Sequence, residues 1–194
     1  MGCNAIVNNV TFDCLSETAL AGLKNLYAIP VVDIDTVTFG VGALEHTITG
    51  ITTTGANFVK IESRFETRDF TSEMNRENYN TKTEKTINVL VPGMEKAVLG
   101  AINELACSAK LLVIAELSNV DGAGAPKGIV AGWDKNLGKD GGLLLAAGTT
   151  IETDISGIIG TPIVLTGVGT EIVRRMEGAI TVEDGATGTI ITFA

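Results

Sequence analysis

The amino-acid sequence predicts a mainly β fold of the α+β kind: a sandwich or barrel with one packed amphipathic helix and a long protruding hairpin. Three observations support this class. The chain is skewed toward glycine and β-branched residues, with 23 glycines and 5% aromatic residues among 194. Short β-branched runs are separated by glycine turns, and a single segment has helical periodicity. The length suits one ordinary domain, so we expect residues 1–194 to form a single unit.

The first part of the chain is expected to be an arm followed by short strands. Residues 1–26 carry Asn and Gly breakers and are assigned to an N-terminal arm that ends in a strand at 29–32. The β-branched runs 37–41 and 45–51 lie on either side of Gly42 and predict two strands with a tight connection.

A long hairpin is predicted over residues 57–90. In its first strand, 57–66, apolar and small residues alternate with charged ones, as in a half-buried strand. Residues 67–80 have no apolar periodicity and are expected to be a loop. Residues 81–90 would be the returning polar strand.

The helix is predicted over residues 93–109, after Pro92 and Gly93 end the preceding strand. Its apolar residues recur at the spacing of one helical face. They are Met94, Val98, Ala101, Ile102, Leu105 and Ala109. Residues 111–117 and 127–133 then predict a second hairpin. After a loop at 134–142, short glycine-punctuated strands are expected at 143–153, 161–167, 179–182 and 189–193.

The charge of the chain argues against tight binding of nucleic acid. The formal net charge is −9 and the sequence pI is about 4.6, so a chain-wide positive surface is lacking. A surface lined with carboxylates would instead let a polyanion pass without adsorbing.

Targeting and membrane signals are weak. The N-terminus lacks a basic flank before an apolar run, so we expect neither a secretory signal nor a lipid anchor. The longest uncharged run, 155–170, has 16 residues and is too short to span a bilayer. The odd set Cys3, Cys14 and Cys107 favours reduced thiols over a disulfide scaffold or a zinc site, although Cys3 and Cys14 could approach each other across a hairpin.

No catalytic, cofactor-binding or metal-binding residues are predicted, and we expect the chain not to be an enzyme. His46 is the only histidine and stands in a β-branched run, where a strand histidine is the simpler interpretation. The acidic pairs Asp33 with Asp35 and Glu183 with Asp184 have too few neighbouring ligands to complete a calcium loop. The glycine-rich segments do not match phosphate-binding or dinucleotide-binding motifs.

One charge pattern points to a function. Between residues 60 and 85, six basic and six acidic residues cancel, so the rest of the chain keeps 8 of the 14 basic and 17 of the 23 acidic residues. The balanced set could be an ordinary solvated face. It could also be an inter-subunit arm, because complementary charges fix register in self-assembly. The set comprises Lys60, Glu62, Arg64, Glu66, Arg68, Asp69, Glu73, Arg76, Glu77, Lys82, Glu84 and Lys85.

The order of elements resembles that of bacteriophage tail tube (major tail) proteins. The likeness is closest in residues 14–27, with the run Gly-Leu-Lys-Asn-Leu-Tyr at 22–27, and in residues 80–117, where a polar strand, the helix and an apolar strand follow one another. Both segments look like tail proteins of phages infecting Bacteroidetes. The family also resembles the tubes of contractile injection systems and of type VI secretion.

The resemblance implies a structural virion protein. Six copies would form a ring, and stacked rings would form a tube with a β-rich lumen wall through which DNA passes without specific binding. The implied partners are further copies of the chain and other phage tail proteins, with no cofactor and no membrane. The protein would be made in the bacterial host cytoplasm and reside in the virion tail.

An acidic lumen would suit such a DNA conduit. Glu152 and Asp154 flank Thr153 and would point to one side of a continuing strand, which makes them the preferred lumen pair. Alternatives are a neck or head–tail connector protein, a capsid decoration protein, or a non-viral β-sandwich binding module. The last would be expected to gather aromatic residues in a pocket, and here they are spread thinly.

Overall fold

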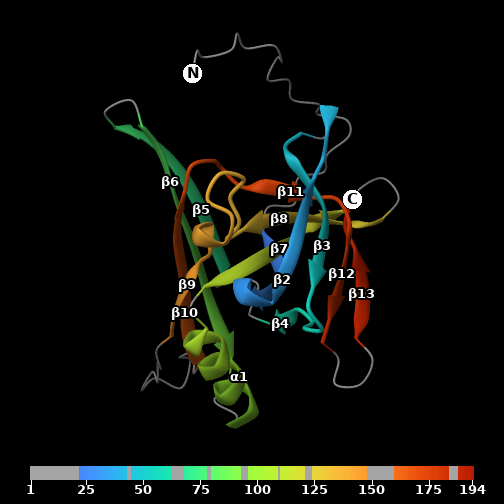
Figure 1. Ribbon diagram of the computed structural model, residues 1–194. Coiled ribbons are helices and arrows are strands. Elements are labelled where there is room, and N and C mark those ends of the chain that lie inside the picture. Colours follow the sequence, from blue (N-terminus) through green and yellow to red (C-terminus); the bar gives the residue numbers. More distant parts are fainter. Residues whose placement is uncertain are drawn as a thin grey trace.

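The computed structural model describes residues 22–42, 45–62, 68–77, 80–92, 96–108, 110–120, 124–147, 160–183 and 188–194. Within these ranges the chain is mainly β and has one α-helix, α1 (Lys96–Cys107), which confirms the mainly β part of the predicted class. Figure 1 shows the helix at one end of a body made of strands. The strands form three sheets of seven, four and two members.

The seven-stranded sheet lies in the middle of the molecule. Its neighbours are antiparallel except β3 and β11, which run parallel. In spatial order it contains β2 (Ile34–Phe39), β3 (Thr47–Thr53), β11 (Arg174–Met176), β8 (Pro126–Ala131), β7 (Leu111–Val120), β1 (Leu23–Pro30) and β4 (Val59–Ile61). A short 3-10 turn, η1 (Val31–Asp33), joins β1 to β2.

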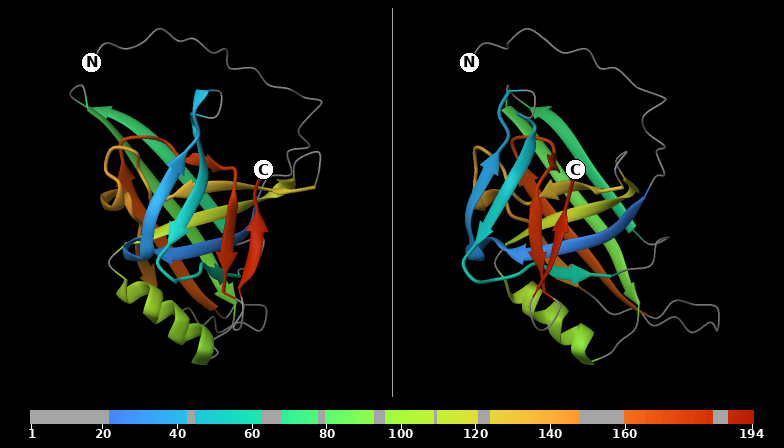
Figure 2. Two further views of the ribbon diagram at one scale, coloured as in Figure 1. Left: turned by 45° about the vertical axis from the view of Figure 1, so that its right-hand side comes forward. Right: turned by 90° about the vertical axis from the view of Figure 1, so that its right-hand side faces the viewer.

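The two smaller sheets lie on opposite sides of the first (Figures 1 and 2). One is the antiparallel sheet β5 (Arg68–Glu77), β6 (Asn80–Pro92), β10 (Gly160–Gly169) and β9 (Leu144–Ala147). The other is the hairpin β12 (Ala179–Val182) and β13 (Thr189–Thr192). A second 3-10 turn, η4 (Lys139–Gly141), precedes β9.

Two apolar cores follow from this layering. The first lies between the seven-stranded and four-stranded sheets and includes Leu26, Ile87, Ile163 and the helical Leu105. The second lies on the opposite face, where Tyr27 and Phe193 meet edge to face with ring centroids 6.1 Å apart. Strands β1 and β7 are therefore covered on both faces. This explains why the start of β7, Leu-Leu-Val-Ile-Ala, is a continuous apolar run.

The predicted N-terminal arm is too long at its C-terminal end. Residues 23–26 belong to β1, a strand inside the seven-stranded sheet, and Leu23 and Leu26 are buried. The Asn and Gly residues that suggested an arm mostly precede this strand. The rest of the predicted arm, 1–21, lies outside the described residues.

The predicted hairpin 57–90 is wrong in its first strand. Segment 59–61 forms β4, which pairs with β1 in the seven-stranded sheet instead of with 81–90. The predicted loop 67–80 contains β5, and β5 pairs with β6 from Arg68 opposite Val89 to Glu77 opposite Asn80. A strand with one open face and a far end beyond the core needs little apolar alternation, so its sequence resembles a loop. Residues 63–67 lie outside the described part.

The helix prediction 93–109 is confirmed at its centre by α1. Ile102 and Leu105 are buried in the first core as expected, whereas Ala101 is exposed because it borders an open groove beside β4. The predicted hairpins 37–51 and 111–133 are also confirmed, as β2 with β3 and β7 with β8. Strand β11 was not predicted, because Arg-Arg-Met gives no strand pattern.

Candidate assembly surfaces

The β5–β6 hairpin is the most prominent projection among the described residues. Strand β10 pairs with β6 only from Thr83 to Pro92. Asn80–Lys82 and the facing end of β5 therefore extend beyond the other two strands of the sheet. Figure 1 shows this end leaving the body, and both views of Figure 2 agree. The hairpin therefore presents backbone and side chains to the outside well away from the two cores.

The four-stranded sheet has one covered and one open face. On β6, Ile87, Val89 and Val91 point into the first core, so the residues between them point outward. Applying the pairing registers to the neighbouring strands extends the open face across the sheet. It comprises Asp69, Thr71, Glu73 and Asn75 of β5, Lys82, Glu84, Thr86, Asn88 and Leu90 of β6, Pro162, Val164, Thr166 and Val168 of β10, and Leu144 and Ala146 of β9.

Charge on this open face is confined to the β5–β6 half. Three carboxylates, Asp69, Glu73 and Glu84, stand against one ammonium, Lys82, which leaves two negative charges among these side chains. Lys82 Nζ lies 2.5 Å from Glu84 Oε1. The β9–β10 half carries no charge and leaves Leu144 and Val168 about half exposed. The face thus has an acidic stripe beside an apolar one.

The twelve charged residues predicted as an arm do not form one surface. Lys60 and Glu62 form a 2.6 Å ion pair beside β4, in a different sheet from the hairpin. Lys85 points inward and is 2% exposed, unlike Lys82 and Glu84. Arg68, Arg76 and Glu77 lie in β5, although their side chains are outside the description, as are Arg64 and Glu66 entirely.

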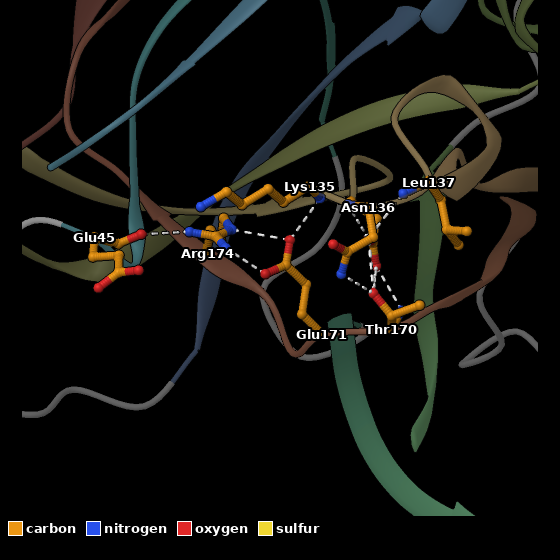
Figure 3. Close-up of polar contacts among 8 residues, drawn as sticks. Glu45, Lys135, Asn136, Leu137, Thr170, Glu171 and Arg174 are labelled. Atoms are coloured by element: carbon orange, nitrogen blue, oxygen red, sulfur yellow. Dashed lines mark hydrogen bonds and ion pairs between the residues drawn. The ribbon is translucent and has the colours of Figure 1, made fainter. Parts of the chain in front are cut away.

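A buried carboxylate joins two loops near the hairpin end of β10, where Gly169 pairs with Thr83. Figure 3 labels Asn136 and Thr170, one residue from each loop. Asp134 follows β8 and accepts hydrogen bonds from the backbone N–H groups of Asn136 (2.8 Å), Leu137 (3.2 Å) and Thr170 (2.5 Å). The Thr170 hydroxyl donates to it as well, at 2.9 Å from Oδ1. Burial opposes ionisation of Asp134, but these hydrogen bonds outweigh it and hold its pKa below the usual value. Asp134 therefore fixes the β10–β11 connection to the β8–η4 loop.

Arg174 extends this connection to the β2–β3 hairpin. Its guanidinium binds the Glu171 carboxylate, and its Nη1 donates to the backbone carbonyl of Glu45 at 2.6 Å (Figure 3). The guanidinium carbon also lies over the Phe39 ring, 4.9 Å from its centre, within the range of a cation–π contact. Asp134, Glu171 and Arg174 together hold the described loops at this end in fixed positions, which we call the loop joint.

Lys85 approaches the loop joint from the four-stranded sheet. A Cβ added to Gly169 would lie 3.2 Å from Lys85 Nζ and 2.9 Å from Asp134 Oδ2, so both groups crowd the same glycine. Burial lowers the pKa of Lys85, whereas the charges of Asp134 and Glu171 act to raise it. The buried ammonium of Lys85 thus offsets the negative charges of Asp134 and Glu171, and its side chain does not face the surface.

A second buried carboxylate lies in the middle of the seven-stranded sheet. Glu116 accepts hydrogen bonds from Tyr27 Oη at 2.7 Å, Asn25 Nδ2 at 2.6 Å and Lys24 Nζ at 2.8 Å. Burial would raise the pKa of Glu116, but these donors hold it below its usual value. Burial, and then the Glu116 carboxylate, raise the pKa of Tyr27. With Lys24 as the counter-ion, this network links the side chains of β1 to β7 in addition to their backbone pairing.

The other residues considered in the sequence analysis do not cluster around a common site in the part of the chain that the structure describes. His46 lies exposed in a turn before β3, not inside a strand. Asp35 accepts a hydrogen bond from Thr54, and Glu183 accepts one from Asn57. Cys107 is an exposed free thiol, while Cys3, Cys14, Asp184 and the lumen pair Glu152 and Asp154 lie outside the described residues.

Within the described ranges no three His, Cys, Asp or Glu side chains are close enough to hold a metal ion. None of the helices described there is long and apolar enough to cross a membrane. The loop joint was not predicted, although an Asp such as Asp134 often accepts a hydrogen bond from the backbone N–H two residues later, here that of Asn136.

Comparison with known proteins adds no relative. No family model, curated protein or solved structure matches this chain.

Proposed function

We propose that this chain is a structural virion protein whose copies assemble into stacked, six-membered rings that form a phage tail tube for the passage of DNA. The observation that carries the proposal is the four-stranded sheet, which has one face packed on the core, one open face and, among the described residues, two unpaired edges. Such a sheet is suited to become one segment of a larger wall. The finer fold assignment, a β-sandwich or barrel of the tail-tube type, is part of the same proposal.

The edges supply a means of joining copies. Strand β5 ends the sheet on one side and β9 on the other, and each bonds to a single neighbour among the described strands. An exposed strand edge is a ready template for pairing with another chain. Pairing of unlike edges is a head-to-tail contact, and such contacts generate a closed ring when the rotation permits.

The open face supplies a suitable lining for the ring. Its acidic stripe, with Asp69, Glu73 and Glu84 on β5 and β6, would repel the phosphates of a passing duplex. This face is therefore our candidate lining among the described residues, whereas the predicted lumen pair Glu152 and Asp154 lies outside them. The projecting β5–β6 end would then reach toward the next ring, where its charges would set register.

Electron microscopy of the purified protein tests assembly. We expect tubes of uniform diameter. Single closed rings would favour a neck or head–tail connector, and a protein that remains monomeric at high concentration would favour a binding module; either result overturns the tube.

The lumen assignment has its own matched test. Substituting Asp69, Glu73 and Glu84 together by Lys should leave tubes that retain DNA at low salt and release it at high salt, because counterion release governs such binding. The control replaces the same number of exposed acids elsewhere, Asp35, Glu104 and Asp140. If both triple variants retain equal amounts of DNA, the open face does not line the lumen.

A further inference from the structure

Another sheet edge, that of β4, lies beside α1. Strand β4 ends the seven-stranded sheet, and between it and the helix runs a groove of about 370 Å³. Its apolar floor is formed by Ile61, Val91, Ile102 and Leu105, each less than a tenth exposed, and Ala101 stands on the helical rim. The groove is thus an opening into the first core at a sheet edge.

The backbone of Lys60 faces this opening. The Phe58 N–H donates to the Thr181 carbonyl of β12, and the Phe58 carbonyl accepts from the N–H of Glu183 just after β12, so both groups point away from β1. Alternate residues of a strand direct these groups to the same side, so those of Lys60 point away from β1 too. Among the described residues they have no hydrogen-bond partner. The edge can accept an extended segment, whose alternate side chains would lie on the apolar floor.

The chain contains a segment with the required pattern. In Asn9-Val10-Thr11-Phe12-Asp13-Cys14 the apolar Val10, Phe12 and Cys14 alternate with Thr11 and Asp13. Added to an edge strand, the first set would share one face. Phe12 could then cover the floor at Ile102 and Leu105.

The segment is also within reach. Gly22 lies at the start of β1, whose Leu26 is opposite Ile61 of β4. Four residues of strand span about 13 Å and two strand spacings add about 10 Å sideways, a path of about 17 Å. Residues 15–21 can extend to about 24 Å.

We propose that residues 9–14 bind the edge of β4 as an added strand in their own chain and cover the groove over Ile102 and Leu105. The interaction removes an exposed edge and an apolar opening, both of which favour unwanted association. It does not depend on the tube, since it forms within one copy.

Hydrogen exchange on the full chain tests the added strand. We expect the peptide containing residues 59–62 to exchange at least tenfold faster in Phe12→Asp than in the parent protein, and Thr11→Asp, on the opposite face of the segment, to leave it unchanged. Ala101→Glu, at an exposed helical position, should accelerate it from the groove side. Equal exchange in the parent, Phe12→Asp and Ala101→Glu would overturn the proposal.

Cross-linking identifies the chain that supplies the segment. With Cys3 and Cys107 replaced by Ala, native Cys14 and Ala101→Cys should cross-link by a short bifunctional maleimide at the mass of one chain. Moving the thiol by one residue, with Asp13→Cys and Cys14→Ala, should reduce the yield several-fold. A product at the mass of two chains, or equal yields from the two positions, would overturn the assignment to the protein's own segment.

Discussion

The middle of the seven-stranded sheet and the four-stranded sheet contrast in how their faces are used. Strands β1 and β7 are covered on both sides, and their one buried carboxylate, Glu116, is fully hydrogen-bonded by side chains of the same sheet. Strands β5, β6, β9 and β10 are covered on one side and, among the described residues, leave a face, two edges and a projecting end open. The first sheet supplies most of the buried contacts, and the second leaves the surface that the proposed assembly would use.

The largest effect is expected where the contrast is sharpest. Ile114→Asp would place an unpaired charge in the second core, at a cost of more than about 4 kcal/mol, which is comparable with the whole stability of a domain. We expect no soluble protein. Val164→Asp, on the open face of β10, should fold with a loss of about 1 kcal/mol or less in urea unfolding. Equal losses at the two positions would show that the second face is covered after all.

The Glu116 network should give the next largest effect. Replacing Glu116 by Gln keeps its shape but removes the charge that binds Lys24 and Tyr27, so unfolding at pH 7 should cost about 2 to 3 kcal/mol less than in the parent.

The same variant has a pH signature. The pKa of Glu116 is lower in the folded chain, so its contribution is complete above the unfolded value of about 4.3 and disappears as the pH falls through the folded value. Asp134 acts in the same direction. Urea unfolding from pH 7 downward should show the parent approaching Glu116→Gln in acid. A constant gap between them would contradict the network.

The sequence was informative where burial imposes a pattern. The apolar run of β7 and the helical spacing of Ile102 and Leu105 follow from contact with a core, so both were predicted. Strand β5 was mistaken for a loop because one of its faces is open and its partner supplies backbone bonds that any residue can make.

The loop joint was missed for a different reason. Asp134, Glu171 and Arg174 come together only through folding, since 36 residues separate Asp134 from Thr170. The same holds for the alternating charges at 57–66 and 81–85, which suggested one hairpin although β4 and β6 belong to different sheets. Alternation identifies a strand but not its partner.

The hairpin should affect assembly without affecting folding. Arg76→Glu with Lys82→Glu reverses two charges at the projecting end, and we expect an unchanged circular dichroism spectrum and a free energy of unfolding within about 0.5 kcal/mol of the parent while tubes fail to form. Lys135→Glu with Lys139→Glu makes the same change in charge at exposed positions outside the hairpin and should assemble. Tubes from both variants would show that the hairpin charges are an ordinary solvated surface with no role in assembly.

The smallest effect on the protein itself is expected from the residues first predicted to line the lumen. Replacing Glu152 and Asp154 by Lys should leave both folding and tubes intact, because the open face of the four-stranded sheet, not this pair, is the proposed lining. DNA retained at low salt, measured beside the triple variant of Asp69, Glu73 and Glu84, separates the two assignments, since added cations bind DNA in a salt-dependent manner only where DNA meets them. Retention by the double variant equal to that of the triple variant would extend the lumen to residues 152–154. Retention by the double variant alone would transfer the lumen there and leave the acidic stripe of β5 and β6 on the outside of the tube.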